Sequence, residues 1–251
     1  MGVTIDNRTK EEIGRDVALA ALSNYNTDKK EADPVKRAPA KRQELWRKLG
    51  IAPRSLDREV VELFHSTHMG TDQDADHILT GAMRCALADG WGGSMLTTDI
   101  GDILFGTPGP VAAKVNLGVL KENEVNIVVH GHDPTLAEML VVASTDPELI
   151  EYSKSKGAEG INLAGICCYA NEILMRHGVP VVGNFLSAEL TMATGAIEAM
   201  VVDVQCIMQG IVAAAERYHT KVVTSSPKAH ITGATRIEFD ERRGLEIAKE
   251  I

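Results

Sequence analysis

The stretch that indicates the fold lies at positions 160–172 and reads Gly160-Ile-Asn-Leu-Ala-Gly-Ile-Cys-Cys-Tyr-Ala-Asn-Glu172. Residues 161–166 have the composition of a buried strand, because large apolar and small residues dominate them. The residues that follow predict a helix ending at Gly178, since glycine is favoured directly after a helix. Cys167 and Cys168 therefore stand where a strand turns into a helix. In open α/β sheets, ligands bind at that edge. Strand alternation would put their side chains on opposite sides, so at most one of the two cysteines easily faces a common site.

Two more of the expected strands end in side chains that can bind a metal. The strand 125–129 runs into His130-Gly-His132, and the strand 199–204 is followed by Cys206. His132 precedes Cys168 by 36 positions and Cys206 follows it by 38, which is about one βαβ unit in each case. If the three strands are neighbours, His132, Cys168 and Cys206 meet at one edge of one sheet.

Thiolate and imidazole groups together favour iron, nickel, copper or zinc. The wide spacing differs from the compact Cys-x-x-Cys motifs of zinc fingers and ferredoxins, and so indicates a cluster held by a whole domain. The residues alone leave other roles open. A histidine at a strand end equally fits phosphate binding or a structural hydrogen bond, and free cysteine is a common core residue. Cys85, inside a helical run, is assigned to the core.

Composition limits the classes of function. The 251 residues carry a net charge of −9, which argues against nucleic-acid binding, and 44% of them are hydrophobic, as in a chain with a real core. No run of eighteen apolar residues predicts a membrane span, and the first residues lack the pattern of a signal peptide. We therefore expect a cytoplasmic protein whose four cysteines form no structural disulfides.

The pattern divides the chain into a helical segment, 1–110, and a Rossmann-like domain, 111–251. In the first segment, Thr9-Lys-Glu-Glu12 forms a capping box, and two strong helices are expected at 55–68 and 76–89. The second helix is expected to end sharply at Gly90-Trp-Gly-Gly93. The side chains expected to face inward from these two helices are Val60, Val61, Leu63, Phe64, Ile78, Leu79, Ala82, Met83 and Leu87.

From about residue 112, strands and helices alternate, which predicts an α/β fold with a parallel sheet covered by helices on both faces. The expected strands are 125–129, 161–166, 180–183, 199–204, 221–225 and 236–239. The expected helices are 134–144, 147–157, 170–177, 187–196 and 207–218.

Asp89 is a further candidate, because it follows an apolar helix and precedes a glycine-rich turn. A partly buried carboxylate there acts either as an acid/base group or as a helix cap. His65, His68 and His77 are assigned to a solvated, acidic helix surface. The turns after the strands carry neither a Gly-x-Gly-x-x-Gly nor a Walker motif, and no Gly-x-Ser-x-Gly elbow occurs, so a Rossmann nucleotide site and a serine hydrolase are disfavoured.

As a set, several motifs resemble the nickel-dependent, anaerobic carbon monoxide dehydrogenases, including those that pair with acetyl-CoA synthase. The similarity runs over most of the chain from about residue 50. The matching segments are Ala88-Asp-Gly-Trp-Gly-Gly93, Asp102-Ile-Leu-Phe-Gly-Thr-Pro108, Asn116-Leu-Gly-Val-Leu-Lys121, Val129-His-Gly-His132, Gly165-Ile-Cys-Cys168, Asn171-Glu-Ile-Leu-Met-Arg-His-Gly-Val-Pro180 and Val202-Asp-Val-Gln-Cys-Ile207.

The resemblance implies a nickel–iron–sulfur cluster that oxidises CO with water to CO2, two protons and two electrons. It implies that His132 and Cys168 bind the iron outside the cubane and that Cys206 binds a cubane iron. It also implies that Asp89 assists proton transfer. The expected partners are CO, CO2 and water, the remainder of the dehydrogenase or acetyl-CoA synthase complex, and a second copy in a homo-oligomer. No nucleic acid or membrane partner is expected.

The chain also departs from that family. Family enzymes are considerably longer and carry further cysteine motifs, a second Rossmann-like domain, and a catalytic lysine and histidine that this chain lacks. Tyr169 stands where a small residue is expected, and Gln209-Gly210 replaces a Pro-Ser-like helix start. We therefore expect the middle part of the enzyme, with a partial ligand set and no CO oxidation by the chain alone. Two alternatives stay open: a relative of the hybrid-cluster (hydroxylamine reductase) proteins, and a non-catalytic scaffold domain.

Overall fold

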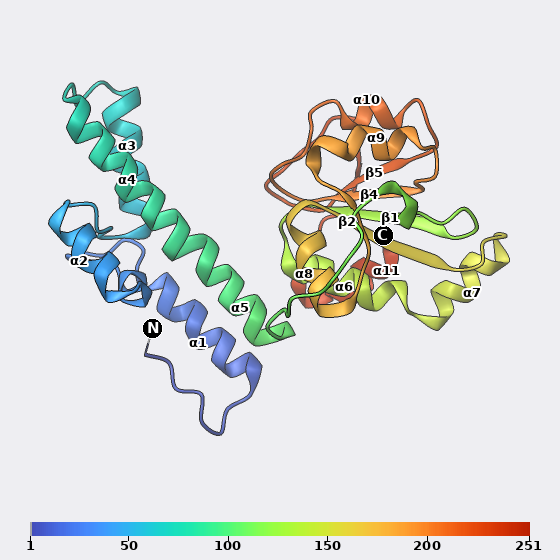
Figure 1. Cartoon of the computed structure of the whole chain (residues 1–251), viewed down its shortest axis with the longest axis horizontal. Coiled ribbons are helices and arrows are strands. Elements are labelled where there is room, and N and C mark those ends of the chain that lie inside the picture. The colour runs from blue at the N-terminus through green and yellow to red at the C-terminus, as the bar shows by residue number, and fades with distance from the viewer. Residues whose placement is uncertain (1) are drawn as a thin grey trace. The chain divides into compact units, whose positions relative to one another are not determined.

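The computed structural model describes residues 2–251. The chain forms two compact units, Met1–Thr107 and Pro108–Ile251 (Figure 1). Across the described part of the chain, no helix is both long enough and apolar enough to cross a membrane.

The first unit is helical. Its capping box is confirmed, since the Thr9 hydroxyl accepts from the Glu12 amide and the Glu12 carboxylate accepts from the Thr9 amide. A small core forms around Trp46, which meets Trp91 edge-on with ring centroids 5.4 Å apart. The helices are α1 (Lys10–Leu22), η1 (Asp33–Arg37), α2 (Ala40–Lys48), α3 (Leu56–His68), α4 (Ala75–Leu87), the π-helical η2 (Ala88–Ser94) and α5 (Met95–Phe105).

The expected break at Gly90-Trp-Gly-Gly93 is wrong, because helical backbone continues from α4 through η2 into α5. Glycine is a poor helix former, but here packing outweighs that preference. A Cβ atom on Gly92 would lie 1.9 Å from Cδ2 of Leu56, so the glycine is what lets α3 approach this helix closely. Gly92 therefore serves a helix contact rather than a chain reversal.

The prediction that the apolar side chains of α3 and α4 face inward is also partly wrong. Val60, Val61 and Phe64 on α3, and Leu79 and Met83 on α4, are exposed, with Leu79 at 60%. Phe64 stacks on the His68 ring at a centroid distance of 4.1 Å. Helical periodicity identifies which side chains share a face, but it does not supply the element that covers that face.

The second unit confirms the expected α/β fold. Six parallel strands form one sheet in the order β3-β2-β1-β4-β5-β6. This is the doubly wound Rossmann order, in which the direction of winding reverses between β1 and β4. The strands are β1 (Val125–His130), β2 (Ile161–Ile166), β3 (Val181–Gly183), β4 (Ala199–Val202), β5 (Lys221–Thr224) and β6 (Thr235–Arg236).

Helices cover both faces of this sheet, as Figure 1 shows with α9 and α10 on one side and α6 and α11 on the other. The longer helices confirm the sequence prediction, whereas the expected helix 207–218 is reduced to five residues. The helical elements are η3 (Leu117–Val119), α6 (Pro134–Ser144), α7 (Pro147–Ser155), α8 (Cys167–His177), η4 (Phe185–Ser187), α9 (Ala188–Ala193), α10 (Ile211–Ala215), η5 (Glu241–Arg243) and α11 (Gly244–Glu250).

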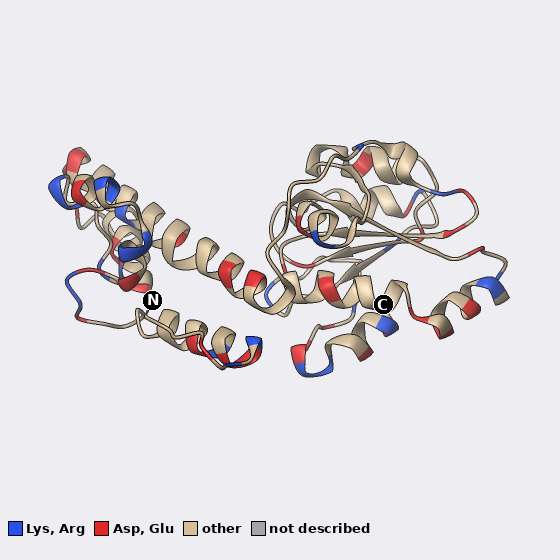
Figure 2. Ribbon diagram, turned by 60° about the horizontal axis from the view of Figure 1, so that its bottom comes forward, with Lys and Arg blue, Asp and Glu red and all other residues tan. Residues whose placement is uncertain are grey.

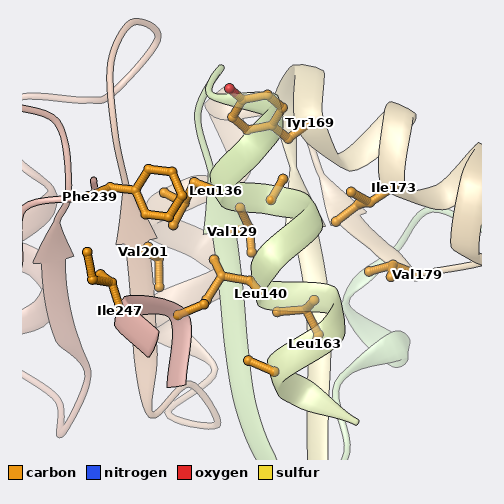
Figure 3. Packing of buried hydrophobic residues seen from close by; sticks show 13 residues of the cluster. Val129, Leu136, Leu140, Leu163, Tyr169, Ile173, Val179, Val201, Phe239 and Ile247 are labelled. Atoms are coloured by element: carbon orange, nitrogen blue, oxygen red, sulfur yellow. The ribbon is translucent and has the colours of Figure 1, made fainter. Parts of the chain in front are cut away.

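Neighbouring residues of a strand pack into two separate hydrophobic cores, one on each face of the sheet. Val129 points to the core formed with α6, α8 and α11, which includes Leu136, Ile173 and Ile247 (Figure 3). Val128, the residue before it, points to the opposite core with Met192 of α9. The strands β1 to β4 contain no lysine, arginine, aspartate or glutamate, and the charged side chains lie mainly on outer helices and loops (Figure 2). A sheet buried on both faces holds the strand ends firmly, and the candidate site lies at those ends.

Candidate metal centre

The three strands that carry the candidate ligands are neighbours, as the sequence analysis required. In the sheet register, His130 at the end of β1 pairs with Ile166 of β2 on one side and with Val202 of β4 on the other. The residues that follow these three positions therefore leave the sheet at the same edge. The winding direction reverses between β1 and β4, which is where doubly wound sheets bind ligands.

A buried carboxylate joins the turns after β1 and β4. Both oxygens of Asp203 accept from the His132 amide, at 2.8 and 2.9 Å, and Oδ2 also accepts from the Asp133 amide at 2.7 Å. The amide of Val204 donates to the same carboxylate. A Cβ atom on Gly131 would lie 1.9 Å from Asp203 Oδ1, so the turn between the two histidines has room only for glycine. Burial raises the pKa of Asp203 to about 6.

The His132 ring is held in one orientation. Its Nδ1–H donates to the carbonyl oxygen of Val204 at 3.0 Å, and the Tyr169 ring lies 6.0 Å away, centroid to centroid. A neutral imidazole that donates through Nδ1 keeps the lone pair on Nε2. Metal-binding histidines are commonly oriented in this way, by a carbonyl or carboxylate that accepts from the second nitrogen.

His130 makes a parallel connection deeper in the sheet. Its side chain is fully buried, and Nε2–H donates to the carbonyl oxygen of Cys206 at 2.9 Å. Burial lowers the pKa of His130, so the neutral ring is favoured. Its Nδ1, like the hydroxyl of Tyr169, has no hydrogen-bond partner among residues 2–251. His130 therefore binds the segment that presents Cys206 and does not itself point to solvent.

Two of the cysteines have an unusual backbone conformation. Cys167, Gln205 and Cys206 have φ angles of 71°, 61° and 52°, in the left-handed region that non-glycine residues rarely adopt. Such conformations cost about 1–3 kcal/mol each and cluster at functional sites. Gln205 and Cys206 lie in the irregular segment between β4 (Ala199–Val202) and α10 (Ile211–Ala215).

The cysteine pair divides into one half-buried and one exposed thiol. Cys167 packs against the core on the α9 side of the sheet, whereas Cys168 and Cys206 are exposed. Burial, followed by the charge of Cys206, raises the pKa of the Cys168 thiol. The split was expected from strand alternation, but both cysteines belong to the first turn of α8, and the left-handed Cys167 sets their directions. Both line a cavity of about 890 Å³ with Asn116, Asn171 and Asn184.

No three side chains of histidine, cysteine, aspartate or glutamate within residues 2–251 lie close enough together to hold a metal ion. His132, Cys168 and Cys206 thus share one edge of the sheet without forming a preassembled set of three ligands. Their assignment as ligands stays a prediction. Ligand sets of this kind often assemble only when the metal binds.

The sequence pattern of the Prismane/CO dehydrogenase family matches residues 1–251. The chain belongs to this family. Carbon monoxide dehydrogenase 1 of Methanosarcina mazei is 51% identical over 250 residues. The match covers 100% of this chain and 40% of that protein. The carbon monoxide dehydrogenase/acetyl-CoA synthase subunit beta of Moorella thermoacetica is 41% identical over 252 residues, covering 99% of this chain and 37% of the relative.

Solved structures agree with the fold. A nickel-free carbon monoxide dehydrogenase from Thermococcus sp. AM4 superposes with a TM-score of 0.93 at 47% identity, covering 99% of this chain and 40% of that one. The chain therefore spans about two fifths of the length of the relatives that it matches. The resemblance inferred from the motifs is confirmed, and relatives of 41–52% identity are carbon monoxide dehydrogenases rather than hybrid-cluster proteins.

The residues at the sheet edge fit a family metal–sulfur cluster in their chemistry. Two exposed thiols and one imidazole with a free Nε2 are donors for iron and nickel. Two buried polar atoms, His130 Nδ1 and the Tyr169 hydroxyl, have no hydrogen-bond partner among residues 2–251, and they belong to residues within two positions of His132 and Cys168 in the chain. Unpartnered buried polar atoms are rare and call for a specific explanation, such as a catalytic role or a bound ion.

Asp89 belongs to the helical unit, in the first turn of the π-helical segment η2. The expectation that it is partly buried is wrong, because the side chain is exposed. The glycine-rich turn expected to follow Asp89 does not form, because helical backbone continues through η2. Its catalytic role stays a prediction.

Two residues of this site, Asp203 and His130, are not among the candidates that the sequence indicates. Asp203 had a usable signal, since it interrupts the apolar run Met200-Val-Val-Asp-Val204 at the end of a strand buried on both faces. A carboxylate there must find hydrogen-bond donors. His130 was quoted only as part of the motif, and its burial depends on the sheet register.

Proposed function

We propose that this chain supplies His132, Cys168 and Cys206 to the nickel–iron–sulfur cluster of a carbon monoxide dehydrogenase. When bound, such a cluster supplies the redox chemistry by which CO and water give CO2, two protons and two electrons. His132 and Cys168 would hold the iron outside the cubane, and Cys206 a cubane iron. The substrates would be CO or CO2 and water.

The observation that carries this proposal is the Nδ1–H bond from His132 to the Val204 carbonyl. It gives the ring the tautomer with a free Nε2, at the switch point of a doubly wound sheet. A phosphate site would instead use the free ring nitrogen as a donor. The exposed thiols of Cys168 and Cys206 at the same edge supply the soft ligands that an iron–sulfur cluster needs.

Asp89 would hold or pass a proton during the reaction, as its exposed carboxylate allows. The remaining cluster ligands would come from the remainder of the enzyme, since the relatives are about 2.5 times as long. The full enzyme would act as a homo-oligomer. The Moorella thermoacetica relative bears the name of an acetyl-CoA synthase complex, so a synthase subunit is a candidate partner.

Anaerobic reconstitution of the 251-residue chain with iron, sulfide and nickel tests the proposal. We expect iron bound through thiolate and imidazole, no full complement of nickel, and no CO-dependent reduction of a redox dye. Iron analysis that finds no metal after desalting would contradict ligation by this chain. Robust CO oxidation by the purified chain would contradict the proposed partial ligand set.

A second candidate function is that of a folded scaffold that binds no cluster. It is favoured by one observation, that residues 2–251 hold no close set of three metal-binding side chains. The same experiment separates the two, because a scaffold would fold without iron and would gain no stability from it.

A further inference from the structure

Asp203 accepts only backbone amides in the described structure, and it accepts them from both turns at the sheet edge. Asp203 is buried, with 2% of its surface exposed. The donors are His132 and Asp133 from the turn after β1, and Val204 from the turn after β4. Burying a carboxylate costs free energy unless its oxygens accept hydrogen bonds. A buried aspartate at this position therefore indicates a specific role for its hydrogen bonds.

The contacts form a closed ring around His132. The His132 amide donates to Asp203, the Val204 amide donates to the same carboxylate, and the Val204 carbonyl accepts from His132 Nδ1–H. Asp203 thus fixes both the backbone of His132 and the amide of Val204, the residue whose carbonyl orients the His132 ring. The segment that leaves this anchored peptide enters the left-handed region at Gln205 and Cys206.

We propose that Asp203 is a positioning residue for the cluster ligands, which sets the orientation and tautomer of His132 and fixes the start of the segment that carries Cys206. The inference rests on the proposed function in taking His132 and Cys206 as ligands. Asp203 itself touches neither metal nor substrate. It acts through amide hydrogen bonds that a purely apolar residue cannot replace.

Two substitutions disturb these contacts by different routes. Asp203→Asn keeps the size of the side chain but places an NH2 group against amide donors, so the ring of contacts opens. Gly131→Ala keeps the carboxylate, but the new Cβ would lie 1.9 Å from Asp203 Oδ1 and displace it. Asn162→Ala is the matched control, because Asn162 is a buried polar residue with side-chain hydrogen bonds at the opposite end of β2.

The first readout needs no metal. Nitrogen-15 NMR of the imidazole side chains in the folded, metal-free chain is expected to show His132 as the Nδ1–H tautomer in wild type and in Asn162→Ala. In Asp203→Asn and Gly131→Ala, the population is expected to shift toward the Nε2–H tautomer. Circular dichroism establishes that each variant analysed is folded.

The second readout is the affinity for Co²⁺, a probe of mixed thiolate and imidazole ligation. We expect a loss of about 10–100-fold in both site variants, as is typical when a partner behind a ligand is removed, and less than about 3-fold in the control. A folded Asp203→Asn variant with wild-type tautomer and Co²⁺ affinity overturns the proposal and leaves Asp203 a structural role alone. If wild type binds no Co²⁺ but the tautomer shifts as expected, the proposed function fails and the positioning role stands.

Discussion

The Nδ1 atom of His132 lies 3.0 Å from the carbonyl oxygen of Val204, across the reversal between β1 and β4. This bond ties a side chain on one strand end to the backbone of the next strand in the sheet. It selects the tautomer, because a carbonyl oxygen accepts and cannot donate. The free Nε2 is then the only ring nitrogen that can bind a metal.

This geometry predicts different results from two substitutions of His132. His132→Asn places an amide NH2 near the position of Nδ1, so the bond to Val204 is retained and the free energy of unfolding falls by less than about 1 kcal/mol. Metal affinity is lost, because nothing replaces Nε2. Urea unfolding and Co²⁺ titration measure the two effects. The exposed His65→Asn serves as the control, with unchanged metal affinity, and tight binding by His132→Asn would contradict ligation through Nε2.

The cysteine pair predicts a clear division of roles. Cys168→Ala is expected to abolish iron binding on the His132 side, because the exposed thiol is the ligand. Cys167→Ala is expected to retain iron and to lower the free energy of unfolding by about 1 kcal/mol through lost packing. Iron content after anaerobic reconstitution and denaturant unfolding distinguish the two. Greater iron loss from Cys167→Ala would reverse the assignment.

The buried His130 predicts a dependence of stability on pH. Burial lowers its pKa below the ordinary value of 6.5, so the unfolded chain binds more protons than the folded chain once the pH falls below about 6.5. Its contribution to stability is therefore complete above pH 6.5 and is lost on acidification, by up to about 1.4 kcal/mol per pH unit.

His130→Gln tests this contribution, since glutamine retains a donor for the Cys206 carbonyl and does not titrate. Urea unfolding between pH 5 and 7.5 should give a smaller loss on acidification in this variant than in wild type. The exposed His65→Gln should follow the wild-type curve. Identical curves for wild type and His130→Gln would show that His130 contributes nothing.

Two glycines in the π-helical segment predict opposite outcomes. Gly92→Ala places a Cβ atom 1.9 Å from Leu56 and is expected to cost about 1–3 kcal/mol. Gly90→Ala has no atom within 4 Å of its new Cβ and is expected to leave stability unchanged or raise it by up to about 1 kcal/mol. Thermal unfolding of both variants checks the pair. Equal effects would mean that the contact with α3 does not require glycine.

Sequence reasoning worked best where local pattern and burial agree. The strand Ile161–Ile166 and the helix Pro134–Ser144 have the predicted bounds, because a two-sided apolar run and the Asp133-Pro134 cap specify them locally. The prediction was less accurate for the helical unit. The sequence predicts a break at Gly92 because the residue it contacts, Leu56, lies 36 positions earlier, and no local pattern reveals a close approach between helices.

The candidate site shows the same division. Motif and spacing indicated His132, Cys168 and Cys206 as residues that share one sheet edge. Asp203 was missed because its importance lies in hydrogen bonds to residues about 70 positions away. The split between Cys167 and Cys168 was expected for the wrong reason, since a left-handed backbone at Cys167, rather than strand alternation, separates the thiols.

By itself, the sequence determined the parallel sheet, the covering helices and the edge at which the donors gather, because hydrophobic period, caps and spacing are local properties of the chain. Only the tertiary structure decided the tautomer of His132, the burial of His130 and the exposure of Asp89. These depend on hydrogen bonds and packing between segments distant in sequence. Such contacts exist only once the sheet register is fixed, because the register brings Asp203 to His132 and the Cys206 carbonyl to His130.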